Sequence, residues 1–170
     1  MIKKVIYTIS VIGLLFTGCS SKENTNVVTK AEFSDIKVGN KLADFTIEDQ
    51  FDKKHSLTND TKKIIFAFSK PMGHIVKMYM ADKEKGYFEK RNILFIADVS
   101  SMPKIIYNMF ALADMKEANY PMLIILKKEN ALRFRNENKK DYIMILTLDN
   151  KKITNIQYVN NEKDLKKAID

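Results

Sequence analysis

Short apolar runs alternate with amphipathic stretches along most of this chain, and the alternation predicts the order of its strands and helices. Near-continuous apolar runs bounded by charged residues are typical of strands that are buried on both faces. Runs of this kind, together with shorter apolar segments, predict seven strands, at residues 44–47, 54–57, 63–68, 93–99, 122–126, 142–148 and 153–159.

Three other stretches show helical spacing of their apolar residues. Residues 74–90 follow it as far as a weak last turn, and residues 102–113 follow it most clearly, with Ser101 as the expected N-cap. Asn161 is expected to cap a final helix. Strands that alternate with helices and end in a hairpin predict an α/β fold, with a central, mainly parallel sheet, an antiparallel edge hairpin and helices on both faces.

The N-terminal segment has the architecture of a bacterial signal peptide. Lys3 and Lys4 precede an apolar stretch that ends at Phe16, and small or polar residues follow it up to Cys19. The apolar stretch is too short for a typical transmembrane helix, and its flanking residues are those of a signal peptide. Its ending LFTGC resembles the lipobox, in which the cysteine is diacylated and the chain is cleaved before it, although Phe16 stands in place of the usual leucine. An ordinary signal peptide with an incidental cysteine is the alternative.

The resemblance to a lipobox divides the chain into three parts. We expect residues 1–18 to be a lipoprotein signal peptide, residues 19–32 a lipidated N-terminus with a flexible polar tether, and residues 33–170 the folded domain. Two or three acyl chains, palmitate among them, would anchor the protein stably. Because Cys19 is the single cysteine, a chain lipidated there has no thiol left for a disulfide or for cysteine chemistry.

The charge balance excludes one class of partner. The chain carries 29 Lys and Arg against 21 Asp and Glu, a formal net charge of +8. Cleavage before Cys19 would remove Lys3 and Lys4, which leaves 27 against 21, or +6. The excess is mostly scattered lysine, which favours a solvated surface, with attraction to anionic lipid headgroups as the alternative. The expected export of the protein argues against a nucleic-acid partner, and the sequence has no stretch in which arginines alternate with aromatic residues, as many nucleic-acid-binding segments do.

A set of short motifs opens the domain in a fixed order. They are Gly39, ADF at residues 43–45, Asp49, SL at residues 56–57 and the apolar run KIIFAF. This order, and the closing segment YIMILTLDNKKITNIQYV with its final helix, resembles the thioredoxin-like superfamily, in particular its peroxiredoxin and TlpA-like branch. The usual proline before the ADF motif's aspartate is missing. The resemblance covers about residues 38 to 169 and implies a thioredoxin-like fold.

The redox residues of that superfamily do not carry over to this chain. Its redox members place Cys-x-x-Cys after the strand that corresponds to KIIFAF, but residues 69–76 contain no cysteine. The peroxiredoxin pattern Pro-x-x-x-Thr-x-x-Cys can be laid on Pro71, and Ile75 then replaces the threonine and Met78 the cysteine. Methionine cannot form a thiolate, so peroxide reduction by that route is excluded.

The superfamily's cis proline has two registers on this chain. It corresponds either to Pro121 or, with residues 122–126 as an inserted strand, to a position near residues 140–141, where no proline occurs. We favour the second register, because it leaves residues 149–152 in the family's closing turn. Under both registers the resemblance implies a scaffold without thiol machinery.

Polar side chains after two predicted strands define a candidate binding cleft. Ser69, Lys70 and His74 follow one strand, and Asp98 ends the neighbouring one. Ligand-binding groups of open α/β sheets gather at the carboxyl ends of strands. His74 and Asp98 can also be interpreted as a general base and its orienting carboxylate, but no motif for a nucleophile or a phosphate accompanies them.

A methionine-rich stretch raises metal binding as an alternative. Met72, His74, Met78 and Met80 lie close together in the sequence, and thioether and imidazole ligands suit cuprous copper. Methionines at this spacing also serve as core filler. His55 lies in a polar turn without an evident partner.

These observations favour a membrane-anchored cell-envelope lipoprotein whose redox-inactive domain serves in binding or scaffolding, with no cofactor. Its expected partners are the membrane, through the lipid anchor, and an envelope protein, on a surface formed by the helix after Ser101 and the strand-end loops. Handling of cuprous copper is the alternative, and an enzyme of unknown type comes third. In two-membrane bacteria, an aspartate after the lipidated cysteine retains some lipoproteins in the inner membrane. Ser20 and Ser21 follow Cys19 here instead, which favours the outer membrane, facing the periplasm. In a bacterium with one membrane, the protein would lie at the cell surface.

Overall fold

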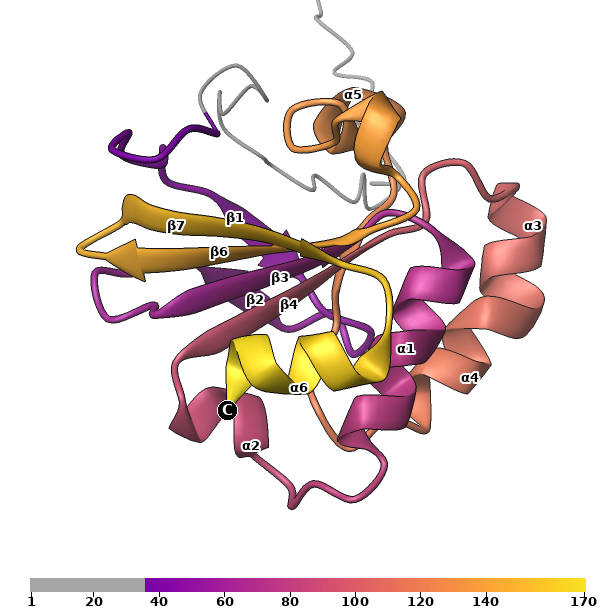
Figure 1. The fold of residues 1–170 in the computed structure, drawn as a ribbon. Helices are drawn as coiled ribbons and strands as arrows, with labels where there is room; N and C mark the ends of the chain where they lie inside the picture. Colours follow the sequence, from indigo (N-terminus) through magenta and orange to yellow (C-terminus); the bar gives the residue numbers. More distant parts are fainter. Residues whose placement is uncertain (1–35) are drawn as a thin grey trace, which may run out of the picture.

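The structure, a computed structural model, describes residues 36–170. Five strands form one mixed sheet in the order β5-β4-β3-β6-β7 (Figure 1). β3 pairs in parallel with β4, and β4 with β5, whereas β6 runs antiparallel to both β3 and β7. The predicted sheet with an antiparallel edge hairpin is therefore confirmed. Its strands are β3 (Lys63–Ala67), β4 (Ile93–Asp98), β5 (Leu123–Ile125), β6 (Ile143–Asp149) and β7 (Lys152–Val159).

A second, two-stranded sheet lies at the β5 edge of the main sheet. β1 (Thr46–Glu48) and β2 (Lys54–Ser56) pair antiparallel, as the sequence predicts. An isolated antiparallel bridge joins Asp49, at the end of β1, to Leu123 of β5. The β1–β2 hairpin thus lies against the outer side of β5, a position in which it partly covers the edge strand.

Helices cover both faces of the five-stranded sheet, as Figure 1 shows. One face packs against α1 (Lys70–Met80), α2 (Tyr87–Lys90) and α6 (Glu162–Ile169). The other face packs against the β1–β2 hairpin and the short helix α5 (Lys128–Ala131). Side chains of β3 alternate between the two faces, Ile64 toward α5 and Ile65 toward α1, and both are fully buried. This double burial explains the near-continuous apolar run in the sequence.

The first long helix differs from its prediction at residues 74–90. α1 begins earlier, at Lys70, because Ser69 has an extended backbone and Pro71 suits the first helical turn. It ends at Met80, and the chain becomes helical again only at α2. Gly86, which precedes α2, has a φ of 80°, a left-handed conformation that interrupts a helix.

The helix predicted at residues 102–113 is present, but its apolar residues are arranged differently from those of an ordinary core helix. It consists of α3 (Lys104–Ile106), a π-helical turn η2 (Tyr107–Ala111) and α4 (Leu112–Lys116), here called the α3–α4 helix, and its N-cap is Pro103 rather than Ser101. It packs on Val99 and Ile124 through Tyr107, with Ala111, Leu112 and Met115 beside it. Four large side chains, called the apolar face, remain 42 to 66% exposed: Ile105, Ile106, Met109 and Phe110.

The closing hairpin and helix follow the prediction. Asn150 and Lys151, in the turn between β6 and β7, have positive φ values of 47° and 66°, the conformation that a tight hairpin turn requires. Asn161 caps α6, since its side-chain oxygen accepts a hydrogen bond from the Asp164 N–H at 2.9 Å. At the other end, the Lys63 ammonium donates to the last carbonyls of α6.

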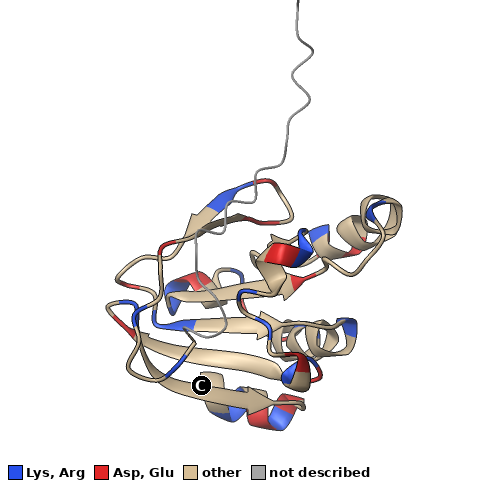
Figure 2. Ribbon diagram, turned by 90° about the horizontal axis from the view of Figure 1, so that it is seen from above, with Lys and Arg blue, Asp and Glu red and all other residues tan. Residues whose placement is uncertain are grey.

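Charged residues are interspersed over the surface of the described domain. In Figure 2, Lys and Arg positions alternate with Asp and Glu positions over loops, strand ends and helices. No helix between residues 36 and 170 combines the length and the hydrophobicity needed to cross a bilayer. The predicted signal peptide, the lipidation site Cys19 and the tether lie outside the described residues.

Candidate functional site

The place of the superfamily's redox cysteines is the junction between β3 and α1. Ser69 forms this junction, and its hydroxyl is buried without a hydrogen-bond partner among the described residues. Lys70 and His74 are exposed on the first turns of α1. The structure thus brings three of the four predicted cleft residues together at the carboxyl end of β3. None of these three side chains carries a thiol.

The fourth predicted cleft residue, Asp98, turns to the opposite face of the sheet. Its neighbour Ala97 packs on the α1 face, so Asp98, one residue further along β4, points the other way. Its carboxylate accepts a hydrogen bond from the Ser100 N–H at 2.9 Å and forms an ion pair with Arg135 at 2.8 Å. The structure therefore pairs Asp98 with Arg135 and the Ser100 N–H rather than with His74.

Arg135 completes a small ionic network that the sequence does not indicate. Its side chain is only 10% exposed, and that of Asp98 only 1%. The same guanidinium forms an ion pair with Glu137, in the short helix η3 (Glu137–Lys139), at 2.7 Å. A buried aspartate with a paired arginine and a backbone donor is fully satisfied. The network therefore fixes the segment before β6 against the end of β4.

The four side chains of the proposed copper site divide between two environments. Met72 and Met80 are buried in the core beneath α1, at 7 and 1% exposure. His74 is exposed, and Met78 is 49% exposed. Within residues 36–170, moreover, no three His, Cys, Asp or Glu side chains gather as metal ligands do. The buried pair matches the core-filling role of methionine.

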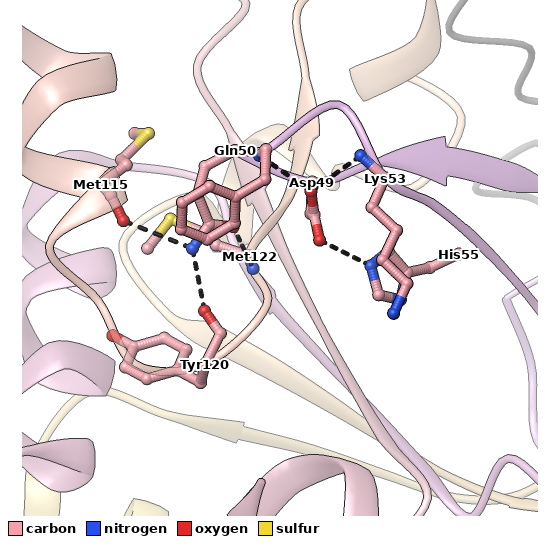
Figure 3. Close-up of polar contacts among 8 residues, drawn as sticks. Asp49, Gln50, Lys53, His55, Met115, Tyr120 and Met122 are labelled. Carbon is pink, nitrogen blue, oxygen red and sulfur yellow. Dashed lines mark hydrogen bonds and ion pairs between the residues drawn. The ribbon is translucent and has the colours of Figure 1, made fainter. Parts of the chain in front are cut away.

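In the turn between β1 and β2, the side chain of Asp49 forms hydrogen bonds with three other residues (Figure 3). Asp49 accepts hydrogen bonds from the backbone N–H groups of Phe51 and Lys53, at 2.8 and 3.0 Å. Its other oxygen contacts the Nε2 atom of His55 at 2.7 Å. Burial raises the pKa of Asp49, but the hydrogen bonds with His55 and the two N–H groups outweigh it and lower that pKa below its usual value. His55, for which the sequence showed no partner, is thus paired.

Gln50 joins this turn to the main domain. Its side-chain amide donates to the carbonyl groups of Tyr120 and Met115, at 2.9 and 3.3 Å, and its oxygen accepts from the Met122 N–H at 2.8 Å (Figure 3). Because Gln50 is only 2% exposed, these bonds satisfy donors and acceptors that water does not reach. The role of Asp49 and Gln50 is therefore to hold backbone segments, and their geometry leaves no free catalytic group.

A shallow recess lies between this turn and the α3–α4 helix. It is lined by Glu48 and Asp52 from the hairpin and by Tyr107 and Asn108 from the helix, among others, and has a volume of about 90 Å³. Burial, with the charge of Asp52 as a smaller cause, raises the pKa of Tyr107. Pockets for drug-sized ligands usually measure about 300 to 1,000 Å³. The recess is therefore too small to indicate a ligand of that class.

Comparison with known proteins identifies the fold. No protein-family model matches the sequence, and the search of curated proteins found no match. Solved structures do match: a proposed protein disulfide isomerase from Bacteroides thetaiotaomicron is 19% identical over 78% of this chain and 86% of that one, with a TM-score of 0.50. The peroxidoxin BcpB from Mycobacterium tuberculosis is 16% identical over 78% and 94% of the two chains, with a TM-score of 0.50.

A third match is a proposed thioredoxin from Neisseria meningitidis, 15% identical over 74% of this chain and 87% of that one, with a TM-score of 0.51. At such identities the likeness shows the fold alone. The chain therefore has the thioredoxin-like α/β fold that its motifs imply. The position of β5, parallel to β4 at the sheet edge, agrees with the register in which residues 122–126 form an inserted strand.

Proposed function

We propose that the protein is a lipid-anchored cell-envelope protein whose thioredoxin-like domain has no redox role and acts by binding a partner protein. The observation that carries the proposal is the junction of β3 and α1. There the fold presents Ser69, Lys70 and an exposed His74, and no sulfur nucleophile. Met78, which aligns with the peroxidatic cysteine, is a thioether and cannot form the thiolate that peroxiredoxin catalysis and disulfide exchange require.

Lys70 and His74, at the start of α1, are called the strand-end surface, and they support a binding role because both are exposed and neither forms a side-chain hydrogen bond or ion pair within residues 36–170. The exposed Lys70 ammonium and the His74 imidazole can each donate hydrogen bonds to a partner's carboxylates or carbonyl groups. The buried ion pair of Asp98 and Arg135 holds the neighbouring segment in place behind this surface. A rigid scaffold that presents exposed polar groups on its connecting segments is typical of a recognition surface.

The anchor is tested by Cys19→Ser. We expect this substitution to move the protein out of the membrane fraction or to leave it unprocessed, because the thioether that carries the acyl chains can no longer form. Fractionation of the envelope and the mass of the N-terminal peptide measure the two effects. Ser20→Ala is the matched control and should stay in the membrane fraction. Unchanged membrane retention and mass of the Cys19→Ser protein would contradict the proposal.

The binding role is tested by crosslinking in intact cells. A photo-crosslinking amino acid placed at Lys70, at the strand-end surface, should give one discrete adduct, whereas the same residue at the exposed Lys152 should not give it. Lys152 lies in the β6–β7 hairpin at the opposite end of the sheet, so the two lysines form a matched pair. Identical adducts from both positions, or thiol-disulfide or peroxidase activity of the purified protein, would refute the proposed role.

A further inference from the structure

The apolar face of the α3–α4 helix is the feature of this molecule that its own core leaves unexplained. Eight large apolar side chains are exposed in the described part of the chain, and four of them form this face. Ile105, Met109 and Phe110 are 66, 64 and 63% exposed, and Ile106 is 42% exposed. Their positions, one, four and five residues after Ile105, place them on one side of the helix. Contiguous exposed apolar side chains on a soluble domain mark an interaction surface.

The contacts of the helix with its own domain lie on another side. Tyr107 is 8% exposed and packs against Val99 and Ile124. Lys77 of α1 also forms an exposed ion pair with Asp114 at 2.6 Å, which joins the last part of the helix to α1. The helix is therefore seated firmly by these contacts. Its four exposed apolar side chains are not part of the cluster around Tyr107, and the exposed portions of these side chains remain available for an occupant.

The shape of the apolar face favours contact with a bilayer over binding of a protruding segment of a partner protein. Figure 1 shows α3 and α4 on the outer side of α1, so the apolar face lies on a projecting helix rather than between elements. The recess beside the helix is lined by Tyr107, Asn108 and Leu112, none of which belongs to the apolar face. A projecting apolar ridge is the shape of an interfacial helix, whose apolar side chains enter a bilayer by about 5 to 10 Å.

The charges of the α3–α4 helix itself are compatible with the headgroup region, and the acidic Glu48 and Asp52 of the hairpin lie at the recess beside Tyr107 and Asn108, residues outside the apolar face. Lys104 begins the helix beside the apolar face, and Lys116 ends it. The acidic residues of the helix and its end are Asp114, whose charge is paired with Lys77, and the exposed Glu117. Both acidic residues follow the four apolar side chains by at least one helical turn. The basic excess of the whole chain adds a weak attraction to anionic lipids.

The proposed lipid anchor places this surface within reach of a membrane. Seventeen residues, 19 to 35, connect Cys19 to the start of the described domain. A chain of that length spans at most about 60 Å, whereas a domain of this size has a radius of gyration of about 14 Å. Any face of the domain can therefore reach the bilayer that holds the anchor. Tethering raises the effective concentration of that bilayer, so a modest apolar contact is sufficient.

We propose that the apolar face inserts into the interfacial region of the bilayer that carries the lipid anchor, and that the α3–α4 helix lies parallel to the membrane surface there. This inference rests on the proposed lipid anchor. The anchor alone would leave the domain free to rotate. The second contact fixes its orientation, so that the strand-end surface is presented at a constant height and angle to an envelope partner.

The experiment uses the lipidated full chain, reconstituted into vesicles of phosphatidylethanolamine and phosphatidylglycerol. Because the acylated Cys19 is the single cysteine, Met109→Cys supplies one free thiol for an environment-sensitive fluorophore. We expect the fluorophore at position 109 to shift to shorter wavelengths, to be quenched by lipids with a nitroxide on the acyl chain and to be at least threefold less accessible to iodide. Leu132→Cys is the control, because Leu132 is 46% exposed and follows α5, away from the apolar face.

A second variant tests whether the apolar face itself makes the contact. Ile105→Gln combined with Phe110→Gln should restore iodide accessibility at position 109 to the level of the control. Flotation with the vesicles scores the anchor separately. Floating protein with a water-exposed fluorophore at position 109 overturns the membrane contact and leaves the anchor standing, and protein that does not float overturns both. A wavelength shift that persists without vesicles and grows with protein concentration assigns the face to a second copy, and also overturns the inference.

Discussion

Asp49 shows how a single buried carboxylate can organise a turn without being catalytic. Its two oxygens are divided between the backbone N–H groups of Phe51 and Lys53 on one side and His55 on the other. Only 3% of its side chain is exposed. These hydrogen bonds stabilise the ionised form, which is why the pKa of Asp49 lies below its usual value despite burial.

The lowered pKa makes a pH-dependent contribution to stability. A carboxyl group whose pKa is lower in the folded than in the unfolded chain stabilises the fold above its unfolded pKa, about 3.9, and loses this effect as the pH falls through its folded pKa. We expect Asp49→Asn to lower the free energy of unfolding by about 1 to 3 kcal/mol at pH 7 and by less at pH 3. Urea denaturation at both pH values measures the difference.

Asp60→Asn is the control for this comparison, because Asp60 is exposed and its substitution should change the free energy of unfolding by less than about 0.5 kcal/mol. A loss for Asp49→Asn that is the same at pH 7 and pH 3 would assign the effect to the shape of the side chain rather than to its charge. For single residues, the sequence predicted where a residue lies relative to the strands but not which side chain it contacts. It placed Asp49 between two predicted strands, but it could not show that His55 returns to it across the hairpin.

The apolar face of the α3–α4 helix is exposed to solvent, and the helix packs on its own domain mainly through Tyr107. In solution without lipid, Ile105→Gln should change the free energy of unfolding by less than about 0.5 kcal/mol, since an exposed side chain makes few contacts. Tyr107→Ala should lower it by about 3 kcal/mol, since it removes a buried aromatic side chain. Chemical denaturation of both variants measures the contrast. Equal losses would mean that Ile105 is packed as Tyr107 is.

Periodicity predicted the existence of this helix but could not predict which side packs. The apolar residues between 102 and 113 follow ordinary α-helical spacing, yet the turn from Tyr107 to Ala111 is π-helical. A π-turn accommodates an extra residue and changes the angle between the residues before and after it. The strands were easier to predict, because β3, β4 and β6 are buried on both faces and therefore nearly continuous in hydrophobicity.

For the whole molecule, the sequence predicted the fold through its motifs and the order of its elements, and the comparisons identify the same fold. The candidate site was only partly predictable. Ser69, Lys70 and His74 follow directly from the position of β3, whereas the partner of Asp98 depends on which face of β4 each helix covers. Arg135 lies 37 residues from Asp98, and Gln50 lies 72 from Met122, so no local pattern connects these pairs.

The position of β3 in the middle of the sheet has a consequence for when the chain can fold during its synthesis. Ile65 pairs with Phe95, 30 residues later, and with Ile145, 80 residues later. Until residue 145 has left the ribosome, the central strand has one neighbour at most, and closing so long a loop is slow. The five-stranded sheet therefore cannot close around its central strand until most of the chain has been synthesised.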